Sequence, residues 1–119
     1  RYAAIPGVVY TNPEISGVGL TEESAKEKGI AYKVATLPMA YAGRFVAENE
    51  GGNGVCKVIV GEKYGQVLGV HMLVNTSSEM IYGACMAIEA EMTIKELEEV
   101  VFPHPTVSEI FKETIFAIE

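Results

Sequence analysis

A histidine held between two prolines is the part of this sequence best suited to chemistry. His104 lies between Pro103 and Pro105, and Glu109 follows five positions after the histidine. A histidine ring can gain or lose a proton near neutral pH with little tuning. Each proline fixes its own φ and disfavours a helical conformation in the residue before it, so we expect His104 on a stiff extended segment ahead of a helix. A ring held in this way could act as an acid or as a base.

Glu109 has two interpretations. Residues 106–109 read Thr-x-x-Glu, the spacing of a helix capping box, in which the threonine hydroxyl accepts one backbone N–H and the glutamate reaches back to another. Residues 76–79 and 93–96 repeat this spacing, so a glutamate is expected here for structural reasons alone. Alternatively, Glu109 is the partner of His104 and fixes the tautomer of its ring. One carboxylate could do both, because a side chain in the first helical turn points back over the preceding residues.

The other histidine and the two cysteines lack the spacing of a metal site, and we expect no metal. His71 lies in the apolar stretch 68–74, which favours a sheet residue that is packed or hydrogen-bonded locally. Cys56 and Cys85 form neither a CxxC pair nor a disulfide framework, which indicates a reducing compartment. Arg44 is expected at the surface, with a contact to a partner as the alternative.

Two glycine clusters invite comparison with phosphate-binding loops, and neither fits. Residues 17–19 read Gly-Val-Gly and lack the third glycine of a dinucleotide fingerprint. Residues 51–54 read Gly-Gly-Asn-Gly and lack the Lys-Ser/Thr pair of a phosphate loop. The sequence therefore predicts no cofactor-binding loop of its own.

The composition is that of one soluble domain. The sequence has 119 residues, of which 49% are hydrophobic and 21% are charged, and a chain of this length forms one core. With 9 Lys and Arg against 16 Asp and Glu, the formal net charge is -7. This balance argues against a nucleic-acid partner, which would need a basic patch. No apolar run reaches the roughly 18 residues of a membrane span, so we expect no membrane partner.

Periodicity and turn residues predict strands first and helices later. Strands are expected over residues 8–11 and 30–37 and as a β-hairpin over 55–60 and 67–74, with an irregular stretch at 41–45 and a loop at 50–54. Helices are expected over 21–28, from 76 to 88, over 93–100, and from 106 onward, the last with Ile110, Phe111, Ile115 and Ile118 as its buried positions. This order predicts an α+β domain, an antiparallel sheet with helices packed on one face.

The chain resembles the C-terminal interface domain of the pyridine nucleotide–disulfide oxidoreductases, and within that family the dihydrolipoyl dehydrogenases. The most specific part of the resemblance is His-Pro-Thr followed by Glu at residues 104–109. It continues in the segments 5–14, 17–22, 67–71 and 109–113 and covers essentially all 119 residues. The resemblance therefore implies that residues 1–119 are a single dimerisation domain of a longer flavoenzyme.

The resemblance also implies a division of labour. In this family FAD, NAD and a redox-active cysteine pair belong to earlier domains, which are absent from this sequence, so the isolated chain should be inactive. The interface domain forms most of the homodimer contact and supplies a His–Glu pair to the other subunit's active site. By position, His104 would be the base that exchanges a proton with the dithiol substrate, and Glu109 would orient it. The backbone of His104 and Pro105 would touch the partner's FAD, and the bond between them would be cis.

The dihydrolipoyl likeness implies a substrate, the dihydrolipoyl group of a 2-oxo acid dehydrogenase or glycine cleavage complex. It favours a bacterial cytoplasm, with the mitochondrial matrix as the alternative. Phe102 stands where many members carry a second histidine, and Asn12 stands where histidine is common; the first change alters packing more than proton chemistry. Two alternatives stay open: the same domain of a glutathione-reductase-like enzyme, and a purely structural dimerisation module in which the motif only caps the last helix.

Overall fold

An antiparallel sheet forms the centre of the computed structural model, which describes residues 3–119. Its five strands lie in the order β1-β2-β5-β4-β3, and every neighbouring pair is antiparallel. The strands are β1 (Gly7–Val9), β2 (Ile15–Gly19), β3 (Tyr32–Pro38), β4 (Val55–Gly61) and β5 (Val67–Leu73). The predicted hairpin is confirmed, because β4 pairs directly with β5.

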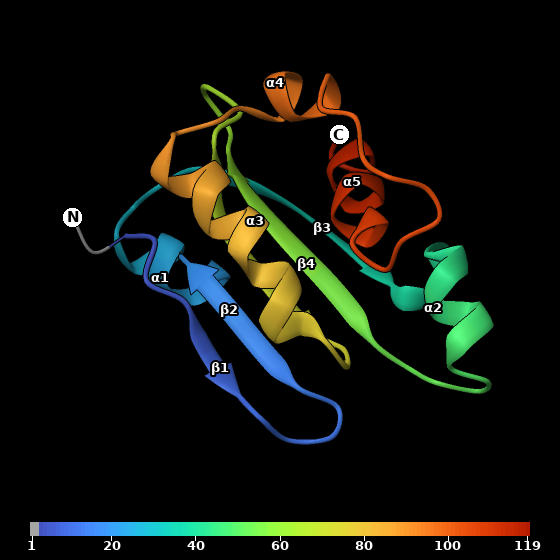
Figure 1. Ribbon diagram of the computed structural model, residues 1–119. Coiled ribbons are helices and arrows are strands. Elements are labelled where there is room, and N and C mark those ends of the chain that lie inside the picture. Colours follow the sequence, from blue (N-terminus) through green and yellow to red (C-terminus); the bar gives the residue numbers. More distant parts are fainter. Residues whose placement is uncertain (1–2) are drawn as a thin grey trace.

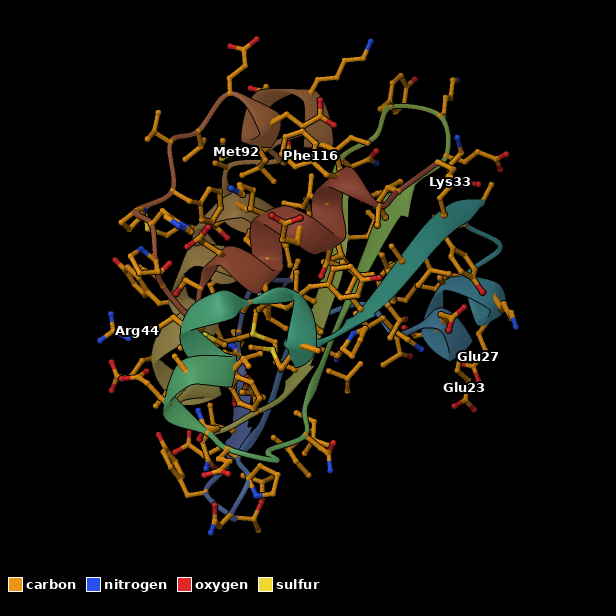
Figure 2. The ribbon with its side chains drawn as sticks, turned by 90° about the vertical axis from the view of Figure 1, so that its right-hand side faces the viewer. Glu23, Glu27, Lys33, Arg44, Met92 and Phe116 are labelled. Carbon is orange, nitrogen blue, oxygen red and sulfur yellow. The ribbon has the colours of Figure 1, made fainter. Side chains whose placement is uncertain are left out.

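Two long helices cover one face of the sheet. The helix α3 (Ser77–Glu89) packs against β2 and β5, and α5 (Glu109–Phe116) packs against β3 and β4, so both lie in front of the sheet in Figure 1. The short α1 (Glu22–Glu27) lies on the opposite side, as the turned view of Figure 2 shows. The remaining helical turns are η1 (Met39–Tyr41), α2 (Gly43–Glu48) and α4 (Ile94–Glu98). The predicted α+β architecture is confirmed, with the two long helices on one face.

The core lies between the sheet and these two helices. Side chains alternate along a strand, and the positions of β4 and β5 that face the helices are buried, among them Val58, Val60 and Val70. The helix α5 contributes Ile110 and Ile115, as predicted, with Phe111 also buried and Ile118 partly buried. The apolar face of α5 is therefore used inside the domain. Across residues 3–119, no helix has the length and apolar character needed to cross a membrane.

β2 is a strand that the sequence pattern did not predict, because two of its five residues are glycines. Glycine weakens a strand pattern, but it is found where another group approaches closely. A Cβ at Gly17 would lie 2.5 Å from His71 Nδ1, and a Cβ at Gly19 would lie 2.1 Å from the carbonyl oxygen of Leu68. Groups of the neighbouring strand β5 therefore leave no room for a side chain at either position. The pairing of β2 with β5 cannot be seen in the local sequence.

The expectation of an irregular stretch at residues 41–45 was wrong. The chain there forms η1 and then α2, and Ala42 and Phe45 are buried beside the core. The segment is too short to show a helical repeat of apolar residues. The buried residues Ala42 and Phe45 nevertheless anchor the segment in the core. Arg44 lies between them in the sequence, so its backbone is held in place.

One of the three predicted capping boxes forms in full. Thr93 Oγ1 accepts the Glu96 N–H at 3.2 Å, and Glu96 Oε1 accepts the Thr93 N–H at 3.0 Å. The box predicted at residues 76–79 was wrong, because Thr76 has φ 71 in the left-handed region and makes no side-chain cap. Instead, Glu14 from the β1–β2 turn accepts the Ser78 N–H at 3.1 Å. A distant carboxylate therefore replaces the local cap of α3.

Candidate active site at His104 and Glu109

An irregular segment between α4 and α5 carries His104. Thr106 Oγ1 donates a hydrogen bond to the Pro103 carbonyl at 2.8 Å, and the Phe102 ring meets the Phe111 ring edge-on with centroids 6.4 Å apart. The His104–Pro105 peptide bond is cis, as the resemblance implied. His104 thus stands just ahead of α5, on a segment held by one contact within itself and by one with α5.

Both carboxylate oxygens of Glu109 lie within hydrogen-bond distance of one nitrogen of the His104 ring. Nδ1 of His104 lies 2.9 Å from Oε1 and 3.0 Å from Oε2 of the carboxylate. The glutamate side chain is only 11% exposed, whereas the histidine side chain is 79% exposed. A carboxylate can only accept here, so Nδ1 carries the proton and donates it. In the neutral ring, Nε2 is then the nitrogen with a free lone pair, and it has no hydrogen-bond partner within residues 3–119.

Glu109 also serves the start of α5. Its Oε1 accepts the Thr106 N–H at 2.8 Å, and Lys112 Nζ lies 3.7 Å from Oε2. The hydrogen bond from His104 is the largest cause that lowers the pKa of Glu109, and the Thr106 N–H lowers it further. The expected contact between Glu109 and His104 is present, whereas the predicted capping box is present only in part, because α5 begins at Glu109 itself. The box is only half formed, since the Thr106 hydroxyl is directed to Pro103.

Arg44 is the residue near this segment that sequence reasoning did not assign to it. Its side chain is 48% exposed, which confirms the expected surface position, and Nε lies 3.2 Å from Glu48 Oε2. Nη1 of the same guanidinium donates to the Pro105 carbonyl at 3.4 Å. The two residues are 61 positions apart. No local pattern could have linked them, because the contact depends on α2 and on how the sheet places it.

The other candidate residues lie elsewhere. His71 Nε2 donates to the Leu20 carbonyl at 2.9 Å, which confirms a locally bonded sheet residue. Cys56 is fully buried, and burial raises the pKa of its thiol to about 11. Cys85 is half-buried with a raised pKa, again because of burial. Within the described residues, no group of three or more His, Cys, Asp or Glu side chains could hold a metal ion.

The sequence of this chain matches a known protein family over most of its length. The sequence profile of the pyridine nucleotide-disulphide oxidoreductase dimerisation domain matches residues 5–115. This chain belongs to that family. The match covers the sheet, both long helices and the His104 segment, so the resemblance read from the motifs is confirmed over nearly the whole chain.

Two dihydrolipoyl dehydrogenases and one flavoprotein disulfide reductase are among the proteins similar to this chain. A dihydrolipoyl dehydrogenase of Rhizobium etli is 42% identical over 93% of this chain, and the mitochondrial dihydrolipoyl dehydrogenase of Pisum sativum is 37% identical over 98% of it. The HOCl-induced flavoprotein disulfide reductase RclA from Escherichia coli superposes with a TM-score of 0.89 at 34% identity, over 97% of this chain. The chain spans 23% of the length of the two dehydrogenases and 26% of the reductase chain.

Proposed function

We propose that this chain is the interface domain of a flavin-dependent dihydrolipoyl dehydrogenase, in which it forms the homodimer contact and supplies His104 and Glu109 to the partner subunit's dithiol–disulfide site. One observation carries the proposal: a buried carboxylate holds Nδ1 of His104 while the rest of the ring projects out of the domain. A purely structural cap would not need the histidine. The dehydrogenases of Rhizobium etli and Pisum sativum support the choice of enzyme.

His104 exchanges a proton with the substrate in this proposal. Only a thiolate attacks a disulfide, and an ordinary thiol is mostly protonated at neutral pH. Nε2 of His104 takes the proton from one thiol of the dihydrolipoyl group, and the resulting thiolate attacks one sulfur of the partner's disulfide. The S–S bond breaks, and its electron pair leaves on the other sulfur as a thiolate. Glu109 stabilises the protonated ring formed in this step, because its charge lies against Nδ1.

FAD, when bound in the full enzyme, accepts the two electrons that the dithiol gives up. This chain could contact the flavin through its backbone, since His104 and Pro105 are both exposed and the His104 carbonyl accepts no hydrogen bond within the described residues. An exposed carbonyl can accept a hydrogen bond from a ring N–H. His104 and Pro105 are therefore the residues that would touch the partner's flavin, while NAD belongs to a domain outside this sequence.

The dihydrolipoyl group of a 2-oxo acid dehydrogenase or glycine cleavage complex is the substrate that we propose. A glutathione-reductase-like enzyme could use the same His–Glu pair on another disulfide. Turnover of dihydrolipoamide against turnover of glutathione disulfide, measured on the full-length protein, separates the two. We favour the cytoplasm of a bacterium, and the pea relative keeps a mitochondrial setting as the alternative.

A purely structural dimerisation module is the second candidate. The outward face of α3 favours a helix contact, because Tyr82 is 69% exposed and Met86 is 56% exposed, with Gly83 between them. Charges on the apolar face of α5 would unfold the domain, since that face is core. The sharper test of assembly is Tyr82→Glu with Met86→Glu, which should shift the full-length dimer toward monomer in sedimentation velocity.

The substitution His104→Gln in the full-length protein tests the proposed chemistry. We expect turnover to fall by about 10² to 10⁴-fold, the usual contribution of an acid–base group, with the dimer intact. His71→Gln is the matched control and should keep normal turnover, because His71 bonds to Leu20 away from this segment. Normal turnover in His104→Gln would leave only the structural role.

A further inference from the structure

The guanidinium of Arg44 joins α2 to the segment that carries His104. Nη1 donates to the Pro105 carbonyl at 3.4 Å, and Nε is held by Glu48 Oε2 at 3.2 Å, one helical turn further along. Figure 2 shows Arg44 extending from α2 toward the side of the sheet on which α5 lies. The contact with Glu48 therefore orients the Arg44 side chain, and the contact with Pro105 links it to another segment.

Apart from its contacts with α5 and the core below it, the His104 segment is held by few hydrogen bonds. The hydrogen bonds of residues 101–108 in the described part of the chain stay within residues 103–111, apart from the one from Arg44. Glu109 ties the turn to the start of α5, which Ile110 and Ile115 anchor in the core. The Arg44 bond ties this turn to a second anchored element, since Phe45 and Ala42 hold α2 in the core.

Arginine suits this position better than lysine would. Its planar group offers five N–H donors in a rigid fork, so it can bond to a carboxylate and a carbonyl at once. An exposed ion pair such as that of Arg44 and Glu48 contributes little to stability. Position can matter more than stability, because misplacing a reacting group by about 1 Å can cost on the order of 10²-fold in rate.

We infer that Arg44 is a positioning residue for His104. It acts through the Pro105 carbonyl, and it sets where the exposed ring stands relative to the other subunit. The inference rests on the proposed function, because a position matters only if His104 takes part in the reaction. It requires no contact between Arg44 and the substrate.

A double-mutant cycle in the full-length protein tests this role, with dihydrolipoamide as substrate. Arg44→Met keeps most of the apolar stem and removes the fork. We expect it to lower kcat about 10-fold, less than the loss for a full 1 Å displacement, with KM changed less than twofold. Arg44→Lys should recover only part of kcat, because an ammonium is a single point donor. Lys33→Met, a charge removal on the exposed surface of β3, is the matched control and should leave kcat unchanged.

The cycle separates positioning from a general structural effect. In a His104→Gln background, Arg44→Met should cause no further loss, since there is no base left to position. An equal further loss, or a kcat for Arg44→Met that matches Lys33→Met, overturns the inference. If His104→Gln itself turns over normally, the proposed function fails and this inference fails with it. If His104→Gln is slow and Arg44→Met is normal, only the role of Arg44 is lost.

Discussion

Glu109 binds Nδ1 of His104 through both carboxylate oxygens, at 2.9 and 3.0 Å, while it also receives the Thr106 N–H at the start of α5. One buried side chain thus shapes the helix start and orients the histidine. Glu109 is the first residue of α5, so the helix fixes the position of its carboxylate. The carboxylate in turn fixes the orientation of the His104 ring. The exposed Nε2 is consequently aimed away from the domain, where a second subunit could use it.

Replacing Glu109 with glutamine tests the electrostatic part of this arrangement. Glutamine can still accept from Nδ1 and from Thr106, but it has no charge to stabilise the protonated ring. We expect Glu109→Gln in the full-length protein to lower kcat about 10²-fold, near the lower end of acid–base contributions. Steady-state kinetics with dihydrolipoamide measures this. A variant with unchanged kcat would mean that Glu109 is only a helix cap.

The buried thiol of Cys56 predicts a loss of stability in alkali. Burial raises the pKa of this acid from 9.0 to about 11 in the folded chain, so the unfolded thiol ionises first. The contribution of the neutral thiol is complete below pH 9 and is lost as the pH rises from about 9 to 11. The full loss of stability approaches about 3 kcal/mol, since one pKa unit corresponds to about 1.4 kcal/mol.

The measurement for Cys56 is the difference in unfolding free energy between the 119-residue chain and its Cys56→Val variant, followed from pH 8 to 11. Tyrosines and lysines titrate in both proteins and cancel in the difference. A valine variant that loses stability in parallel with the native sequence would show that the Cys56 thiol ionises as easily in the folded chain as in the unfolded one.

Replacement by alanine should affect two strand glycines to very different extents. A Cβ at Gly69 in β5 would lie 1.9 Å from the Leu20 carbonyl oxygen, whereas a Cβ at Gly7 in β1 would meet nothing within 4 Å. We expect Gly69→Ala to destabilise the chain by roughly 3 kcal/mol, because backbone must move. Gly7→Ala should stay within about 0.5 kcal/mol. Urea unfolding of both variants decides this, and similar stabilities would contradict the register of β2 and β5.

The two threonines before α4 and α3 differ in what they do. Thr93 caps α4 with its hydroxyl, so Thr93→Ala should cost about 1 kcal/mol. Thr76 makes no cap and sits at φ 71, where an L side chain costs roughly 1–2 kcal/mol. Thr76→Gly should therefore stabilise the chain by about 1 kcal/mol after the entropy cost of glycine. Chemical denaturation measures both, and a destabilised Thr76→Gly would contradict the left-handed conformation.

The sequence predicts well wherever the governing interactions are local. The β4–β5 hairpin follows from two apolar runs and a turn, and the box at Thr93 and Glu96 follows from spacing alone. The His104–Glu109 contact is also local, since both residues belong to one turn and the start of one helix. These features need no knowledge of the rest of the fold.

Structural features that depend on contacts between residues far apart in the sequence could not be predicted from it. The glycines of β2 make sense only beside His71 and Leu68 on β5. The start of α3 uses Glu14 in place of its own threonine, and Arg44 meets Pro105 across 61 positions. In the first two cases tertiary packing overruled a local pattern, whereas Arg44 lies at the surface as expected and only its contact with Pro105 depends on the fold.

Complementation between two inactive subunits tests the central claim most directly. One subunit carries His104→Gln with its cysteine pair intact, and the other keeps His104 but has that pair replaced by serines. Mixed dimers should regain about half of the native turnover per dimer, because one of the two shared sites is whole. Mixed dimers as inactive as either parent would contradict the account, since His104 would then serve only its own subunit or no site at all.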